Sequence, residues 1–109
     1  EETKYTPFSA PQVYARVHEH MKRFDAYSAY FDPYDPNMGM YHLLNDDLGD
    51  IYKDVRRGLE MYQQGTYCAM VEGVFHWKFL FSTHWGQHLV SALTALHAII
   101  AGNLLTSDE

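Results

Sequence analysis

The sequence contains little cysteine, little positive charge and no long hydrophobic run. Its one cysteine, Cys68, cannot form an internal disulfide, so no oxidising compartment is required and we expect a cytoplasmic location. Eight Lys and Arg against fourteen Asp and Glu leave a formal charge of -6, which opposes binding to nucleic acid or to an anionic membrane surface. Residues 88–101 are interrupted by His88 and His97 and fall short of the roughly 20 apolar residues that a transmembrane helix needs.

Common catalytic motifs are also missing from the sequence. No G-x-S-x-G, no phosphate-binding glycine loop and no H-E-x-x-H occurs, and Cys68 follows a turn without a histidine placed beside it. We therefore expect no catalytic residue and no cofactor. The chain begins at Glu1 with neither a Met nor a signal peptide, and we expect residues 1–109 to form a single helical domain, the C-terminal portion of a longer protein.

Apolar and aromatic residues are abundant and indicate a folded chain. Hydrophobic residues make up 47% of the sequence and aromatic residues 16%, which excludes a disordered tail. Apolar residues at helical spacing from Val13 to Phe24 predict a first helix over residues 10–25, with Ser9 as its N-cap. From Asp25 to Asn45 the helical pattern stops, and the prolines and tyrosines there predict a long ordered loop.

Two further helices are predicted from the remaining sequence. Between Asn45, a candidate N-cap, and Gly65, a stop signal, apolar residues fall on one stripe of a helix. A third apolar pattern runs without a break over residues 67–101. Because only two residues separate these patterns, the helices must form a tight antiparallel hairpin, and the longer one must overhang its partner.

The predicted fold class is therefore all-α. It consists of a short helix, a long Tyr-rich loop, and an antiparallel hairpin of a medium and a long helix. The overhanging helix has to be covered by other apolar surface, so we expect the domain to be part of a larger helical bundle or oligomer.

One resemblance rests on two segments of the chain. The first is the string Asp46-Asp47-Leu48-Gly49-Asp50-Ile51-Tyr52-Lys53-Asp54, and the second is His84-Trp85-Gly86 with the aromatic residues before it. In this order they resemble an uncharacterised bacterial all-helical family, a domain of unknown function with a D-D-L-x-D-I-Y-x-D stretch followed by an aromatic-Trp-Gly stretch. The resemblance covers about residues 31–100 and implies an all-helical fold, further N-terminal helices in a longer chain, and no particular activity.

The acidic string supports two hypotheses. Asp46, Asp47 and Asp50 spell D-D-x-x-D, whose carboxylates meet on one helix face as in Mg²⁺-dependent prenyl-transferring enzymes, and Asp54 adds a fourth. A divalent-metal-dependent hydrolase or transferase is therefore one alternative function. The simpler interpretation is that Asp46 and Asp47 stabilise a helix N-terminus while the other two pair with cations.

A pair of histidines supports a second alternative function. His84 and His88 are spaced i, i+4, so both imidazoles can reach one transition-metal ion. Two ligands do not complete a site, and the sequence contains no E-x-x-H that would supply a third. We therefore predict no bound metal and expect the histidines to be hydrogen-bonded packing residues.

Aromatic residues beside these histidines are candidate interaction residues. Trp77, Phe81 and Trp85 lie along one side of the third predicted helix, where they form either core or a protein interface. Gly86 in the middle of that helix indicates close approach of another backbone.

A structural ion pair is also predicted. Counting back from the turn at Gly65 places Lys78 level with Asp54, or one turn away with Asp50, and His84 level with Asp47. The sequence as a whole favours a non-enzymatic protein-interaction or scaffold module of a bacterial protein, binding a protein partner or a second copy of itself.

Overall fold

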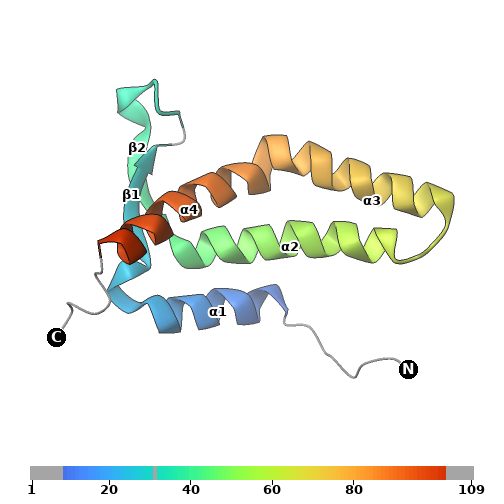
Figure 1. Ribbon diagram of the computed structural model, residues 1–109, viewed down its shortest axis with the longest axis horizontal. Coiled ribbons are helices and arrows are strands. Elements are labelled where there is room, and N and C mark those ends of the chain that lie inside the picture. Colours follow the sequence, from blue (N-terminus) through green and yellow to red (C-terminus); the bar gives the residue numbers. More distant parts are fainter. Residues whose placement is uncertain (1–8, 31, 103–109) are drawn as a thin grey trace.

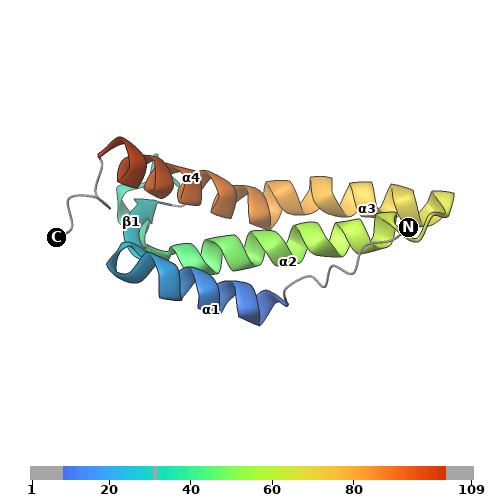
Figure 2. The same ribbon diagram turned by 60° about the horizontal axis from the view of Figure 1, so that its bottom comes forward.

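The fold is predominantly helical and is built around one central helix (Figure 1). In this computed structural model, which describes residues 9–30 and 32–102, helix α2 (Leu44–Tyr62) lies between α1 (Ala10–Met21) on one side and α3 (Tyr67–Leu80) with α4 (Gly86–Ala101) on the other. The same order is visible after rotation (Figure 2). The all-α class and the antiparallel helical hairpin are confirmed.

Helix α1 begins where the sequence predicts. Ser9 accepts a hydrogen bond from the Gln12 backbone, and the Gln12 side chain accepts one from the Ser9 backbone, so the first turn is closed by a capping box. The helix ends earlier than expected, at Met21, and a short 3₁₀ turn, Lys22–Phe24, leads out of it.

The prediction of a long loop from Asp25 to Asn45 is wrong. This segment forms a β-hairpin of strands β1 (Ala26–Tyr30) and β2 (Gly39–Leu43), paired antiparallel with Tyr27 opposite His42. The hairpin projects beyond the helices (Figure 1). Most of β2 is exposed, so the strand lacks the apolar alternation from which a half-buried strand is recognised in a sequence.

Helix α2 is capped by a residue from another segment, and not by Asn45 as expected. The helix begins at Leu44, and Leu43 at the N-cap offers no side-chain acceptor. Instead, the buried Asp25 carboxylate accepts hydrogen bonds from the Asn45 backbone at 2.8 Å and from its side-chain amide at 2.6 Å. The end of the hairpin is thereby fixed against the start of α2.

Helices α2 and α3 are joined by a tight turn and pack closely. Gly65 has a φ of +85°, a conformation that side chains disfavour, so it ends α2 as the sequence predicts. A Cβ on Gly73 would lie 2.7 Å from the Gly58 carbonyl oxygen, and one on Gly58 would overlap the Trp77 ring. These two glycines therefore let the helices approach one another closely.

The expectation of one continuous helix over residues 67–101 is also wrong. A π-helical turn, Phe81–Trp85, separates α3 from α4, and the ribbon bends there (Figure 1). Gly86 donates its backbone N–H to the Phe81 carbonyl across this turn, and a Cβ on Gly86 would lie 2.1 Å from that same oxygen. The wide turn of its own chain, and not the crossing of another backbone, accounts for this glycine.

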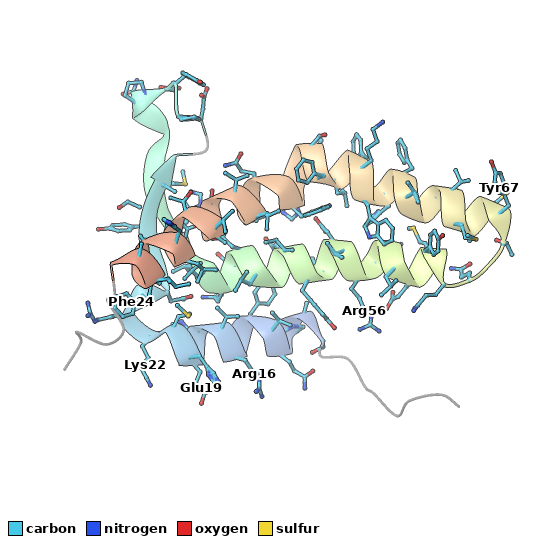
Figure 3. All side chains as sticks on the ribbon, in the orientation of Figure 1. Arg16, Glu19, Lys22, Phe24, Arg56 and Tyr67 are labelled. Atoms are coloured by element: carbon cyan, nitrogen blue, oxygen red, sulfur yellow. The ribbon has the colours of Figure 1, made fainter. Side chains whose placement is uncertain are left out.

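The buried core is small. Among the described residues the buried apolar side chains are Leu44, Ala92 and Ile99, with half-buried residues such as Val17 and Phe24 packed against them. The outer side of α1 is polar, since Arg16, Glu19 and Lys22 point away from α2 (Figure 3). No helix within the described part of the chain has the length and apolar character to cross a membrane.

The exposed surfaces of α3 and α4 carry many large apolar residues, in contrast to the outer side of α1, although Lys78, Thr94 and His97 are exposed there too. Side chains project from α3 on the side away from α2 (Figure 3). We call the exposed large apolar residues of this region the outer apolar face. Its members are Val71, Val74, Phe75, Phe79, Phe81, Leu89, Val90, Leu93 and Ile100.

Candidate functional site

Three carboxylates of α2 lie on the side of the helix that faces the second half of the chain. Asp47, Asp50 and Asp54 are spaced by three and four residues, so their side chains share one helix face. Asp47 and Asp54 are buried and Asp50 is half-buried, whereas Asp46 is exposed. Of the three aspartates of the D-D-x-x-D string, Asp47 and Asp50 therefore belong to this group of carboxylates, and Asp46 does not.

Two histidines meet these carboxylates from the opposite side. His84 belongs to the π-helical turn and His88 to the first turn of α4, and their rings lie edge to face with centroids 4.9 Å apart. The Nδ1–H of His84 donates to Asp54 Oδ2 at 2.6 Å, and the Nδ1–H of His88 donates to Asp47 Oδ1 at 2.7 Å. A carboxylate only accepts hydrogen bonds, so each aspartate fixes a proton on Nδ1 of its histidine.

The other ring nitrogens converge on the remaining aspartate. Nε2 of His88 lies 3.1 Å from Asp50 Oδ2, and Nε2 of His84 lies 3.6 Å from the same oxygen. We call Asp47, Asp50, Asp54, His84 and His88 together the Asp-His cluster. Its centre is the single oxygen atom Asp50 Oδ2, which both imidazoles approach.

Two tyrosines from the N-terminal segments complete the surroundings of the cluster. The Tyr14 hydroxyl of α1 donates to Asp50 Oδ1, and the Tyr27 hydroxyl of β1 donates to Asp47 Oδ2. Burial, followed by the hydrogen bond to Asp50, raises the pKa of Tyr14 to about 12, and burial with the bond to Asp47 raises the pKa of Tyr27 as well. Both phenols therefore stay protonated donors at neutral pH.

The electrostatics of the cluster favour a positive charge at its centre. The hydrogen bond to Asp47 raises the pKa of His88 above its ordinary value, burial opposes this effect, and the nearby carboxylates add to it. Because three carboxylates surround two imidazoles, the cluster attracts either protons or a cation.

The expected ion pair of Lys78 with Asp54 or Asp50 is not formed within the described residues. Lys78 is exposed, so its ammonium stays in water and needs no buried partner. His84 occupies Asp54 instead, and His88, one turn further on, takes the place expected for His84 beside Asp47. The π-helical turn inserts one residue and accounts for only part of this four-residue shift.

The aromatic candidates Trp77, Phe81 and Trp85 occupy different environments. The Trp77 indole donates to the Val55 carbonyl at 2.9 Å, and the Trp85 indole donates to the Trp77 carbonyl at 3.1 Å, so both half-buried rings are engaged within the chain. Phe81 packs edge to face on Trp85 and is 47% exposed. Of the three residues, Phe81 presents the most accessible ring to a partner.

Three residues of the cluster have the geometry of metal ligands. One ligand atom from each of Asp50, His84 and His88 lies within 4.8 Å of the others, and this is the arrangement that the described residues offer for a metal ion. The sequence indicated the acidic string and the histidine pair as separate candidates. The count from the turn at Gly65 brought the two together only through His84 and Asp47, a pairing that differs from the observed ones. Nothing in the sequence indicated that Tyr14 and Tyr27 join the site.

Fold and site together define a small helical protein with an aspartate-histidine cluster between its central helix and the C-terminal one. The chain belongs to a family whose model, described as a domain of unknown function (DUF5063), matches residues 2–102. The resemblance to an uncharacterised domain family is thereby confirmed. No curated protein and no solved structure matches the chain.

Proposed function

We propose that this chain is a non-enzymatic interaction module that docks a second copy of itself on the outer apolar face. The observation that supports the proposal is the exposure of this face on α3 and α4. Phe75 is 64% exposed, Leu93 is 64% exposed and Ile100 is 76% exposed. Contiguous apolar exposure of this kind is typical of interaction sites and is costly in a lone chain.

The size of the outer apolar face matches the requirement of a stable dimer. Its residues are between 40% and 76% exposed. If each presents on the order of 150 to 200 Å² when fully exposed, they leave roughly 850 Å² in water, close to the ~800 Å² per partner of a standard interface. Within residues 9–30 and 32–102, no other segment covers this surface, since each of its residues stays at least 40% exposed.

The spacing of the face along the helices favours a helical partner. Val74 and Phe81 of the face are seven residues apart, and the exposed Tyr67 outside the face continues this spacing seven residues before Val74. Leu89 comes eight residues after Phe81 because the π-helical turn inserts one residue. The inserted residue keeps the apolar stripe on one side of both helices. The same stripe of a second copy, antiparallel to the first, can then pack along it.

The low charge of the face favours a copy of the same chain over a charged partner. Between residues 67 and 101 the fixed charges are Glu72 and Lys78, one of each sign. In a two-fold dimer the same surface of each copy contacts the other, so the surface must not repel itself. The net charge of -6 therefore resides on other surfaces of the chain.

Light scattering coupled to size exclusion tests this proposal. We expect the wild-type chain at high micromolar concentration to have twice the 12.7 kDa mass of one chain. Phe75→Glu and Ile100→Glu each bury one negative charge from each copy in the interface. Each variant should therefore have the mass of a monomer in light scattering.

Tyr34→Glu provides the matched control, since Tyr34 is 94% exposed on the connection between the two strands and outside the face. This variant should remain a dimer. A wild-type chain that stays monomeric at high micromolar concentration contradicts the proposal, as does a Phe75→Glu variant that stays dimeric. We place this module in the bacterial cytoplasm, because its free cysteine needs no oxidising compartment.

A further inference from the structure

We propose that Asp50, His84 and His88 bind one divalent first-row transition-metal ion through one carboxylate oxygen and two imidazole nitrogens. The proposal concerns the inner side of the helical layer, and it does not depend on docking at the outer apolar face. It is carried by the positions of the ligand atoms and by the groups that hold them.

The distances between the ligand atoms match those around a metal ion. Two atoms that each lie about 2.1 Å from one ion are about 3.0 to 3.4 Å apart in octahedral or tetrahedral coordination. The observed separations from Asp50 Oδ2 are 3.1 Å to His88 Nε2 and 3.6 Å to His84 Nε2. Small side-chain rotations therefore suffice to place the three atoms around one ion.

A second layer of hydrogen bonds already orients each ligand. Asp54 and Asp47 hold the Nδ1–H groups of His84 and His88, which turns Nε2 of both rings toward the centre. This carboxylate-histidine arrangement is the one that supports metal-bound imidazoles in proteins. Tyr14 donates to Asp50 Oδ1 and leaves Oδ2 for the metal.

The donor set selects the class of metal. Two imidazoles and one carboxylate suit Zn²⁺, Co²⁺, Ni²⁺ or Fe²⁺, whereas Mg²⁺ and Ca²⁺ prefer oxygen ligands alone. An all-carboxylate magnesium site on the D-D-x-x-D string is disfavoured, because Asp46 is exposed and both oxygens of Asp47 accept hydrogen bonds.

The site also has room for ligands from outside the protein. The His84 side chain is 41% exposed, whereas Asp47 and Asp54 are buried behind the histidines. Three protein ligands on one side of the ion leave its other positions to water or to a small molecule. A π-helical turn, which is frequent at functional sites, places His84 at this open side.

Cobalt and zinc titrations test the proposal. Metal-free wild-type chain is titrated with Co²⁺, whose visible absorption changes on binding, and Zn²⁺ is then added in competition. We expect one ion per chain, displacement of Co²⁺ by Zn²⁺, and no competition from equimolar Mg²⁺. His84→Gln, His88→Gln and Asp50→Asn should each weaken Co²⁺ binding by about 100-fold or more, and Asp54→Asn, one layer further out, by about 10-fold.

His97→Gln is the matched control, because His97 is an exposed histidine of the same helix and should bind Co²⁺ like the wild type. Circular dichroism establishes that each variant is folded. If a variant does not fold, X-ray absorption of the zinc-loaded wild-type chain is measured in place of that variant's titration. We expect two imidazoles at about 2.0 Å from zinc. The alternative is that protons alone hold the cluster together. Two results overturn the proposal: Co²⁺ binding to the wild type that is no tighter than Co²⁺ binding to His88→Gln, or an X-ray absorption spectrum that shows no imidazole bound to zinc.

Discussion

Asp25 joins two segments that are far apart in the sequence. Its buried carboxylate accepts hydrogen bonds from the Asn45 backbone and side chain, and His18 of α1 lies 2.9 Å from it. One side chain therefore connects α1, the hairpin and the start of α2. Nothing about an aspartate twenty residues before a helix marks it in a sequence as the cap of that helix.

We predict that Asp25→Ala lowers the free energy of unfolding by about 1 to 3 kcal/mol, because it removes the cap of α2 and leaves the half-buried donors of Asn45 without this acceptor. Chemical denaturation at neutral pH measures the loss. Glu19→Ala serves as control, since Glu19 is exposed and points away from α2 (Figure 3), and its change should stay within about 0.5 kcal/mol.

The wild type and Asp25→Ala also provide a pH test of the role of Asp25 as a cap. Burial alone would raise the pKa of Asp25, but the hydrogen bonds from His18 and Asn45 outweigh it and lower the pKa below its ordinary 3.8. A lowered folded-state pKa stabilises the fold above pH 3.8, and this stabilisation is lost as the pH falls through the lowered value. The difference between wild type and Asp25→Ala should therefore shrink in acid, and a constant difference would contradict the account.

Candidate site residues were recognisable from the sequence by their type, but not by their grouping. The spacing of Asp47, Asp50 and Asp54 and the i, i+4 pair His84 and His88 are visible patterns. Their meeting depends on the register between two helices, which a count from the turn at Gly65 misses by one turn. The contribution of Tyr14 depends on the packing of α1 and leaves no local signal.

At the scale of elements, regular helices were predictable and irregular ones were not. Helix α2 has an apolar stripe, acidic residues in its first turn and Gly65 behind it, so its position follows from local rules. The π-helical turn has no such rule, since its sequence, Phe81–Trp85, continues the apolar pattern on both sides. The hairpin escaped prediction for a similar reason, because four of the five residues of β2 are exposed and the inward residues of β1, such as Tyr27, are only half-buried.

Gly86→Ala tests whether the π-helical turn requires a glycine. In a regular helix this change adds about 1 kcal/mol of stability. Here the new Cβ would lie 2.1 Å from the Phe81 carbonyl oxygen, a backbone atom that cannot move aside alone. We therefore expect thermal and chemical denaturation to show a loss of about 1 to 3 kcal/mol.

Ser82→Ala changes an exposed residue in the same turn and should leave stability within about 0.5 kcal/mol. A Gly86→Ala variant more stable than the wild type would show that the turn relaxes to a regular α-helix at no cost, and the structural role assigned to this glycine would then be wrong.

At the scale of the whole molecule, α3, α4 and the turn between them have two different sides. The inner side holds His84 and His88 against the aspartates of α2, and the outer side carries the outer apolar face. The small core explains this division, because a single layer of helices packed on α2 can bury only one side of each. The proposed dimer and the proposed metal site therefore use separate surfaces.

We predict that dimerisation and metal binding are independent of each other. Phe75 lies nine residues before His84 and Ile100 twelve residues after His88. At 1.5 Å per helical residue these separations are about 13 and 18 Å, beyond the ~7 to 10 Å within which substitutions usually interact. Monomeric Phe75→Glu and Ile100→Glu should thus bind Co²⁺ within about threefold of wild type, and His84→Gln should keep the dimer mass in light scattering. If monomeric variants lose the metal, the site depends on contact between copies, whereas retained binding in a chain that never dimerises contradicts the docking proposal alone.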